Sequence, residues 1–342
     1  MKRLAKVMLI LVAGIMVLVI TLMAIYWAPD RSVAELQQWQ LPSSEFIEVD
    51  GTRVHVVQSA LCSQYQNQTA VEDSALPNAQ MPKVIVLLHG TSASLHTWDG
   101  WSKALDNEYC VVRMDLPGFG LTGPFQDASQ TYSSANYAAV VTQVIDKLHL
   151  PKATFAGNSL GGKIAWRIAA LYPDYVENLI LIDAVGYPAT STKVPIGFKL
   201  ARYSALKPVL TRILPRDVVR KSIVSVYADE SKVTEELVTR YYELTLRQGN
   251  RHSLSKRLRE FDNIEDQDQI AKLKVPTLII WGAKDELIPV ENAALFHKNI
   301  KGSQLIIFDT LGHVPHEEDP IATVTAAQKF LDQHAINNKE KQ

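Results

Sequence analysis

A series of short, mostly β-branched apolar runs constrains the fold of this chain more than any other sequence feature. The runs occupy residues 84–88, 110–114, 153–156, 179–182, 277–281 and 304–308. Their length and composition are typical of strands buried on both faces of a parallel sheet. Helical patterns separate several of them, for example at residues 137–149 and 163–171. This alternation of strands and helices predicts an α/β fold.

Two further patterns divide the chain. Residues 46–49 and 53–57 alternate around Asp50-Gly51, which predicts a β-hairpin. Residues 187–268 contain helical patterns and no buried-strand run, which predicts an all-helical cap over the carboxyl edge of the sheet. The expected organisation is an anchor (1–28), a linker (29–45), a first core part (46–186), the cap (187–268), a second core part (269–335) and a tail (336–342).

The N-terminal segment has a strong compositional bias. Residues 7–27 carry no charged side chain, and basic residues precede them at Lys2, Arg3 and Lys6. Because about 20 apolar residues span a bilayer as a helix, the run predicts one transmembrane anchor. A cleaved signal peptide is the alternative, although its apolar region is usually only about 7–15 residues long. The basic flank predicts a cytoplasmic N-terminus and an extracytoplasmic remainder, at the inner membrane if the host is a bacterium.

The cysteine content and the overall charge narrow the function classes. The chain has 35 Lys and Arg against 36 Asp and Glu, so nothing in its net charge of −1 favours nucleic acid as a partner. Its two cysteines, Cys62 and Cys110, exclude a multi-cysteine zinc site. On the extracytoplasmic side the two could form a disulfide. Two free thiols remain the other possibility, because the sequence does not give their distance.

The motif most informative about chemistry is Gly157-Asn158-Ser159-Leu160-Gly161. A buried-strand run precedes it and a helical pattern follows it, so Ser159 is expected in a sharp strand-to-helix elbow. Such a serine projects above the sheet near a helix N-terminus, which favours developing negative charge. The alternative reading is an ordinary helix-capping serine.

A serine nucleophile needs a general base, and the base needs an orienting acid. Asp285 follows the run at 277–281, and His313 follows the run at 304–308. Both positions lie at carboxyl ends of strands, in the order serine, acid, histidine. Asp183, after the run at 179–182, is the rival acid, and His316 is the rival base, without the glycine-led turn that precedes His313.

An acyl-transfer site also needs hydrogen-bond donors for the oxyanion. His89-Gly90-Thr91-Ser92 directly follows the run at 84–88. The backbone N–H of Thr91, or of Ser92, is expected to act together with the N–H of Leu160. His89 is expected to pack beneath the site as a structural residue.

With these residues in view, the chain resembles an α/β-hydrolase fold serine hydrolase with a helical cap. The resemblance covers about residues 46–333 and includes the segments 115–120, 281–289 and 312–317. It implies esterase, lipase, thioesterase, lactonase or carbon–carbon bond hydrolase activity without a cofactor. The Gly-Asn-Ser-x-Gly-Gly elbow is similar to that of the meta-cleavage-product hydrolases. Those enzymes often have Trp after the catalytic histidine, where this chain has Val314.

A second glycine motif gives no reason to expect a cofactor. Gly118-Phe119-Gly120-Leu121-Thr122-Gly123 matches the dinucleotide pattern G-x-G-x-x-G. Pro117 and Pro124 bracket it, and no helical pattern opens there to bind a pyrophosphate. No zinc-protease or Walker motif is present. We therefore expect neither a cofactor nor a metal.

The predicted cap contains a basic amphipathic stretch. Between residues 193 and 221, Asp217 is the only acid, and the basic residues are Lys193, Lys199, Arg202, Lys207, Arg212, Arg216, Arg220 and Lys221. Such a stretch can lie on an anionic membrane or form a solvated cap surface. The sequence as a whole predicts a membrane-anchored serine hydrolase for small-molecule carboxylic esters, with lipid-like acyl esters favoured. A carbon–carbon bond hydrolase and a non-catalytic ligand receptor remain the alternatives.

Overall fold

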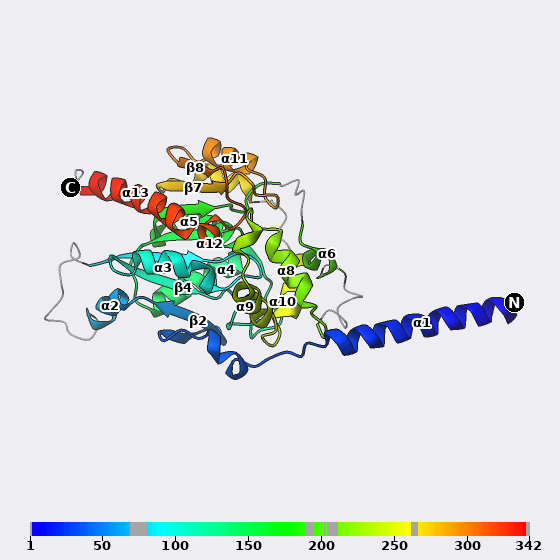
Figure 1. Cartoon of the computed structure of the whole chain (residues 1–342). Helices are drawn as coiled ribbons and strands as arrows, with labels where there is room; N and C mark the ends of the chain where they lie inside the picture. Colours follow the sequence, from blue (N-terminus) through cyan, green and yellow to red (C-terminus); the bar gives the residue numbers. More distant parts are fainter. Residues whose placement is uncertain are drawn as a thin grey trace.

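A computed structural model describes residues 2–68, 81–188, 194–201, 203, 211–260 and 266–339 of the chain. These residues form one eight-stranded sheet in the order β1-β2-β4-β3-β5-β6-β7-β8 (Figure 1). The strands are β1 (Ser44–Val49), β2 (Thr52–Gln58), β3 (Lys83–Leu88), β4 (Tyr109–Met114), β5 (Ala153–Asn158), β6 (Val176–Ile182), β7 (Thr277–Gly282) and β8 (Gln304–Phe308).

Strand pairing follows the predicted pattern. β2 pairs antiparallel with both β1 and β4, and every later neighbour is parallel. The hairpin closes at Asp50 and Gly51, which have φ values of 46° and 76°, as a tight two-residue turn requires. The predicted α/β class and mostly parallel sheet are confirmed.

Helices cover both faces of the sheet. One face packs against α4 (Ser134–Lys147), α5 (Leu160–Leu171) and α11 (Glu291–Asn299). The other packs against α3 (Asp99–Leu105) and α13 (Pro320–Lys339). The remaining core elements are α2 (Ser63–Gln68), α12 (Pro315–Glu318) and the 3-10 helices η2 (Ala60–Cys62), η4 (Leu95–Trp98), η5 (Pro173–Tyr175) and η8 (Gln267–Lys272).

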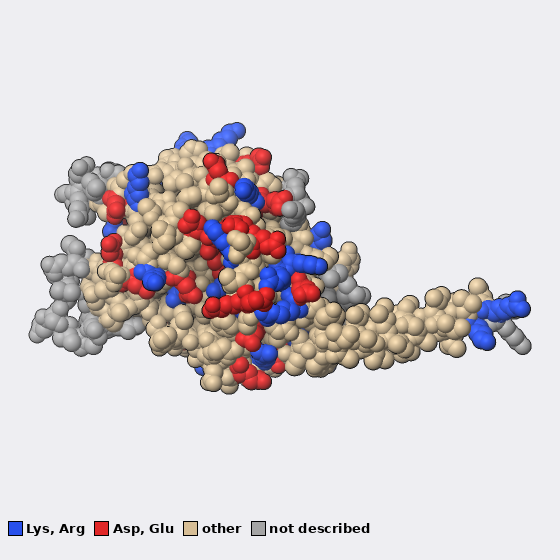
Figure 2. Space-filling view, viewed as in Figure 1, with Lys and Arg blue, Asp and Glu red and all other residues tan. Residues whose placement is uncertain are grey.

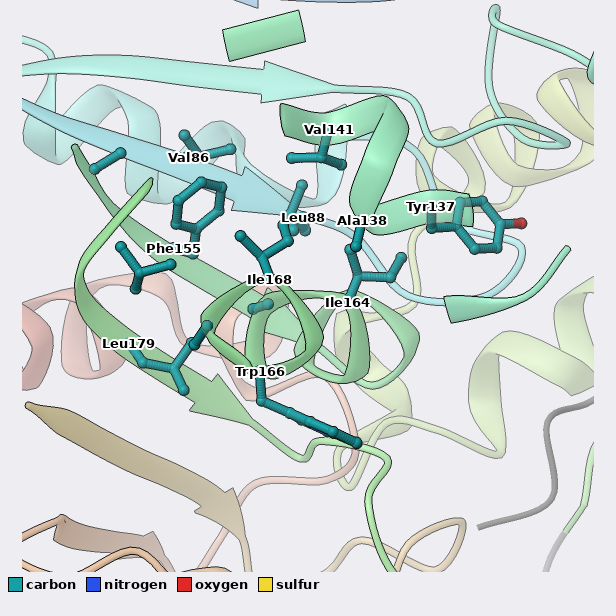
Figure 3. Close-up of a cluster of buried hydrophobic side chains, with 14 of the residues drawn as sticks. Val86, Leu88, Tyr137, Ala138, Val141, Phe155, Ile164, Trp166, Ile168 and Leu179 are labelled. Atoms are coloured by element: carbon teal, nitrogen blue, oxygen red, sulfur yellow. The ribbon is translucent and has the colours of Figure 1, made fainter. Parts of the chain in front are cut away.

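The period-two alternation of β3 shows why both faces need cover. Val86 and Leu88 pack on the side of α4 and α5, whereas Leu87 packs on the side of α3 and α13. Figure 3 shows the first cluster, where Ile164 and Ile168 of α5 meet the strand side chains. Because the strands are buried on both faces, the positions of their ends are fixed. The site residues project from these ends.

The described part of the segment between β6 and β7 contains helices joined by turns and no strand of the sheet. It contains α6 (Ile196–Ala201), α8 (Arg216–Val224), η7 (Glu230–Lys232), α9 (Glu235–Thr245) and α10 (Asn250–Arg259). Ile223, Tyr227 and Val238 form a small apolar cluster that includes Val314 of the core. The helical insertion therefore packs directly on the loop that carries His313.

The N-terminal segment forms one long helix, α1 (Lys2–Tyr26), that projects from the body (Figure 1). It is apolar and unburied, with a mean hydropathy of 3.0 over its most apolar window. Figure 2 shows no charged side chain along its length except at the far end. These properties suit a signal anchor or a signal peptide. The following residues contain a 3-10 helix, η1 (Ala34–Trp39).

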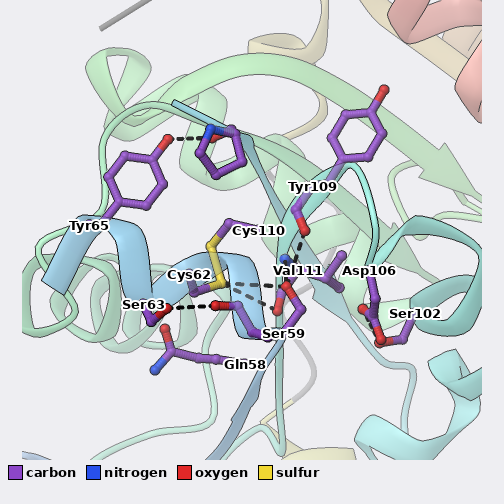
Figure 4. The surroundings of a disulfide bond; sticks show 12 residues. Gln58, Ser59, Cys62, Ser63, Tyr65, Ser102, Asp106, Tyr109, Cys110 and Val111 are labelled. Atoms are coloured by element: carbon purple, nitrogen blue, oxygen red, sulfur yellow. Dashed lines mark hydrogen bonds between the residues drawn. A yellow bond between two sulfur atoms is a disulfide. The ribbon is translucent and has the colours of Figure 1, made fainter. Parts of the chain in front are cut away.

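The two cysteines form a disulfide, Cys62–Cys110 (Figure 4). Their Cα atoms are 4.6 Å apart, within the range that a disulfide requires. The bond ties η2 to the second residue of β4, and both sulfurs are buried. Of the two alternatives that the sequence left open, the structure contains the disulfide.

Candidate active site

Ser159 lies in the sharp turn between β5 and α5. Its backbone has φ 54° and ψ −113°, a conformation that is strained for a residue with a Cβ. The surrounding backbone enforces it, because the Ser159 N–H donates to the carbonyl of Ile182 at 3.0 Å and its carbonyl accepts the N–H of Val185 at 3.1 Å. The strand-to-helix elbow expected from the sequence is present.

The glycines of the motif make this turn possible. A Cβ on Gly157 would collide with the backbone of Gly161, and a Cβ on Gly161 would collide with the carbonyl of Leu88. The close approach also lets α5 begin at Leu160 rather than at residue 163, where the helical pattern of the sequence began. The backbone N–H groups of the first helical turn therefore lie directly beside Ser159.

The structure joins Asp285 and His313 by a short hydrogen bond. The distance from His313 Nδ1 to Asp285 Oδ2 is 2.7 Å, and both side chains are buried. Asp285 Oδ1 accepts the N–H groups of Leu287 and Ile288 at 2.8 and 2.9 Å. An ionised carboxylate only accepts hydrogen bonds, so Nδ1 carries the proton and Nε2 is left as the basic nitrogen.

Asp183, the rival acid, lies in the same buried cluster. Carboxylate oxygens of Asp183 and Asp285 and a ring nitrogen of His313 all lie within 4.8 Å of one another. Burial and the neighbouring Asp285 carboxylate raise the pKa of Asp183 well above its usual value. Asp183 accepts a backbone hydrogen bond from Gly282 at 3.1 Å, whereas Asp285 has three partners. Asp285, which has more hydrogen-bond donors and the direct bond to His313, is therefore the better candidate for the acid that orients the histidine.

The same cluster could supply three ligands to a metal ion, but its hydrogen bonds do not suit one. Asp285 Oδ2 and His313 Nδ1 are in direct hydrogen-bond contact at 2.7 Å. A zinc ion would need both atoms free and about 2.0–2.2 Å from the metal. Asp285 Oδ1 already accepts two backbone N–H groups. The donor set fits an acid–histidine pair better than a metal site.

The rival base lies in a different environment. His316 is fully buried, its Nε2 lies 3.1 Å from the hydroxyl of Thr97, and its ring packs on Trp98. Burial lowers its pKa to about 3, so the ring stays neutral. No carboxylate hydrogen-bonds to His316 within the described parts of the chain, which favours His313 as the base.

The residues expected to supply the oxyanion donors belong to two segments that adjoin Ser159. Leu160 is the first residue of α5. A Cβ on Gly90 would lie 3.3 Å from Cβ of Ser159, so the turn that leads to Thr91 packs against the serine. His89 fixes this turn: Nδ1 donates to the carbonyl of Gly90 at 2.7 Å, and Nε2 accepts the N–H of Leu116 at 3.0 Å. His89 thus has the structural surroundings expected of it.

Two positioning residues escaped the sequence analysis. The Asn158 amide donates to the carbonyl of His313 at 2.9 Å, which ties the elbow to the histidine loop. The Glu318 carboxylate is buried and accepts the N–H of Gly312 at 2.8 Å and that of Asp229 at 2.9 Å. It thereby joins the histidine loop to the helical insertion. Asn158 stands inside the elbow motif and Glu318 directly follows the segment 312–317, but their partners His313 and Asp229 are distant from them in sequence.

The G-x-G-x-x-G segment forms turns and opens no helix. A Cβ on Gly120 would collide with the carboxylate of Asp115, and one on Gly123 would collide with Arg247. Side chains of the protein itself therefore occupy the space beside these glycines. The segment lacks the helix N-terminus that a dinucleotide site uses.

The sequence profile of the α/β hydrolase fold family matches residues 83–320. The chain belongs to this family. This membership agrees with the elbow, the strand order and the position of the buried acid–histidine pair.

Individual relatives differ in their activities. An uncharacterized protein of Mycobacterium tuberculosis is 29% identical, with 72% of this chain and 75% of that protein covered. A 2-hydroxy-6-oxo-2,4-heptadienoate hydrolase of Pseudomonas putida is 28% identical, with 72% and 88% covered. The structure of a membrane phospholipase A, described as a bacterial virulence factor, has a TM-score of 0.66 and 23% identity, with 97% of this chain and 99% of that chain covered.

Proposed function

We propose that the protein is a membrane-anchored serine hydrolase that cleaves carboxylic esters, with lipid-like acyl esters as its substrates. The observation that carries this proposal is the buried His313–Asp285 hydrogen bond beside the strained elbow of Ser159. A nucleophile, a base with a fixed tautomer and two sets of backbone N–H groups are the parts that acyl transfer needs.

In the proposed mechanism, Nε2 of His313 takes the proton from Ser159 as the hydroxyl oxygen attacks the ester carbonyl. Asp285 stabilises the resulting imidazolium, and the N–H groups of Thr91 and Leu160 hold the oxyanion. His313 then protonates the departing alcohol, leaving an acyl-serine. A water molecule, deprotonated by His313, releases the carboxylic acid and restores the serine.

Three features support a membrane location and an amphiphilic substrate. Helix α1 is long, apolar and unburied. Cys62 and Cys110 form a disulfide, which persists on the extracytoplasmic side. A membrane phospholipase A shares the fold over nearly the whole chain. We propose that α1 is retained with its N-terminus in the cytoplasm, and that the cap, residues 187–268, selects the acyl group.

A carbon–carbon bond hydrolase is the second candidate. The observation in its favour is the 28% identity to the Pseudomonas putida hydrolase, together with the Gly-Asn-Ser-x-Gly-Gly elbow. Against it stands Val314, which packs into the apolar cluster of the cap helices at the position where those hydrolases often have Trp. A receptor that keeps the fold without turnover is the non-enzyme alternative.

The test is hydrolysis of p-nitrophenyl esters from acetyl to palmitoyl by the full chain in detergent, beside Ser159→Ala. We expect turnover that depends on Ser159 and is fastest for a medium or long acyl chain. A 2-hydroxy-6-oxo-dienoate, followed by its absorbance, serves as the competing substrate. Dienoate cleavage without ester turnover would establish the second candidate, and no turnover of either substrate would favour the receptor.

A further inference from the structure

Backbone hydrogen bonds hold the end of α1 directly against the body. The carbonyl of Tyr26, the last residue of α1, accepts the N–H of Leu214 at 3.1 Å, and the N–H of Ala28 donates to the carbonyl of Arg212 at 2.9 Å. Trp27 and Ile213 form the antiparallel bridge between these two bonds. The predicted anchor therefore meets the helical cap at the residue where the helix ends.

A second set of contacts fixes the angle of this connection. The N–H of Arg31 donates to the carbonyl of Leu246, and the N–H of Gln248 donates to the carbonyl of Arg31. Beside them, Arg31 forms an ion pair with Glu243 at 2.8 Å, and Asp30 pairs with the buried Arg251. Ordered contacts to α9 and α10 thus replace the flexible tether that would let the body turn freely.

The surface at this end of the body has the composition of a membrane interface. Figure 1 shows α6 at the side of the body from which α1 leaves. Large apolar side chains are exposed here, with Trp27 at 49%, Ile196 at 47% and Tyr203 at 64%. Aromatic residues at a helix end are typical of the headgroup layer. Isolated exposed apolar residues are common, but these lie at the end where the bilayer would begin.

The basic side chains on this surface favour contact with anionic lipid. Arg216 and Arg220 both pair with Glu235, whose single carboxylate offsets one of their two charges. Lys199 and Arg212 are exposed and form no ion pair within the described ranges. Basic residues near an anionic membrane surface are attracted to it.

We propose that this cap face, defined by Trp27, α6 and residues 211–214, rests in the headgroup layer of an anionic phospholipid bilayer. The inference rests on the proposed function in one respect, since it requires that α1 is retained as a membrane anchor. It adds that the cap, rather than the opposite end of the core, meets the lipid. An amphiphilic ester then reaches the cap from the bilayer without first crossing bulk water.

The experiment uses the full chain in vesicles of phosphatidylcholine and phosphatidylglycerol. Because Cys62 and Cys110 are paired, a single introduced cysteine can carry an environment-sensitive fluorophore. Ile196→Cys reports on the cap face. Ile321→Cys, at a residue of α13 that is 64% exposed, is the matched control on the core. We expect doxyl-labelled phospholipid to quench the probe at 196 at least about twofold more than the probe at 321.

Charge variants test the lipid chemistry. Lys199→Glu combined with Arg212→Glu should reduce quenching at 196 in anionic vesicles. Lys329→Glu, at an exposed residue of α13, should leave it unchanged. Equal quenching at 196 and 321 in protein that sediments with the vesicles would overturn the inference alone. Protein that loses α1 and stays in the supernatant would overturn the anchor as well, and ester turnover is measured separately from both.

Discussion

Two serine–histidine–aspartate arrays lie in this fold, and they differ in their surroundings. In the first, Asp285 hydrogen-bonds to His313 next to the elbow that carries Ser159. In the second, the hydroxyl of Ser44 lies 2.7 Å from His55 Nε2, and His55 Nδ1 lies 2.8 Å from Asp115. Each aspartate also accepts two backbone N–H groups.

The second array holds the fold together. Asp115 receives the N–H groups of Leu95 and Leu121, which lie in the segments that follow β3 and β4, and His55 is fully buried on β2. Ser44 begins the edge strand β1, and its Oγ also accepts the N–H of Leu41 at 2.8 Å. Ser44 itself lies in an extended strand and not in a positive-φ turn before a helix. The array therefore joins the hairpin to the loops after β3 and β4.

The comparison teaches that a serine, a histidine and an aspartate arranged in this order do not by themselves define a catalytic site. What distinguishes the Ser159 array is a serine held at φ 54°, the first turn of α5 beside it and a second carboxyl group, Asp183, near its acid. The elbow and the first turn of α5 favour a developing oxyanion at this position. The predictions below separate the two arrays, from the largest expected effect to the smallest.

Replacing the two serines should separate the arrays most clearly. Ser159→Ala removes the proposed nucleophile, and we expect ester turnover to fall by about 10⁴-fold or more. Ser44→Ala removes a hydroxyl of the structural array and should leave kcat within about threefold. The measurement is kcat for both variants on the preferred ester. Comparable losses in the two variants would contradict the distinction.

The two aspartates should differ in the property that they control. Asp285→Asn leaves the shape of the side chain but favours the wrong tautomer of His313, so kcat should fall by about 10⁴-fold. The melting temperature of Asp285→Asn, followed by intrinsic fluorescence in detergent, should stay close to that of the wild type although kcat falls. If Asp285→Asn retained wild-type kcat, Asp183 would become the better candidate for the acid.

Asp115 should instead control how the free energy of unfolding changes at acid pH. Burial opposes its ionisation, but the hydrogen bond from His55 and the charges of His55, His89 and His96 together outweigh burial and lower the pKa of Asp115 to about 2. A depressed carboxyl pKa adds stability above the unfolded value and loses it as the pH falls from about 4 towards 2, about 2 kcal/mol in total. Asp115→Asn should therefore be less stable than wild type at pH 7, and the difference should shrink towards pH 2. Urea titrations at several pH values measure this difference.

Asp183 should show the opposite pH dependence. Its pKa is raised by burial and by Asp285, so its neutral form is present in the folded state. Such a group contributes stability below its unfolded pKa, about 4, and loses it as the pH rises through the folded pKa. Asp183→Asn keeps the shape without titrating. Relative to wild type it should gain stability as the pH rises above about 4, whereas a gain confined to acid pH would place the charge on Asp183.

The sequence predicted the parts of the site that local pattern controls. Ser159 stands inside a glycine motif between a strand and a helix, and Asp285 and His313 each follow a buried strand. Their positions at strand ends could be inferred because parallel strands end at one edge of a sheet. The α/β class followed from the same strands, and the family match confirms it.

The remaining features depend on contacts between distant segments. The array of Ser44, His55 and Asp115 joins the hairpin to the end of β4, and nothing in local periodicity indicates it. The same holds for Asn158 and His313, 155 residues apart. The sequence ranked Asp183 below Asp285 but did not place them in one buried cluster. The bridge from Trp27 to Ile213 also required the structure.

The most direct test of the account is covalent labelling with a fluorophosphonate, read out by peptide mass spectrometry. The reagent reports an activated serine whether or not the natural substrate is known. We predict that the wild-type chain is labelled at Ser159 and not at Ser44, and that His313→Gln is labelled at least about 100-fold more slowly. Labelling at Ser44, or equal labelling of His313→Gln, would contradict the claim that Ser159 is the nucleophile activated by His313.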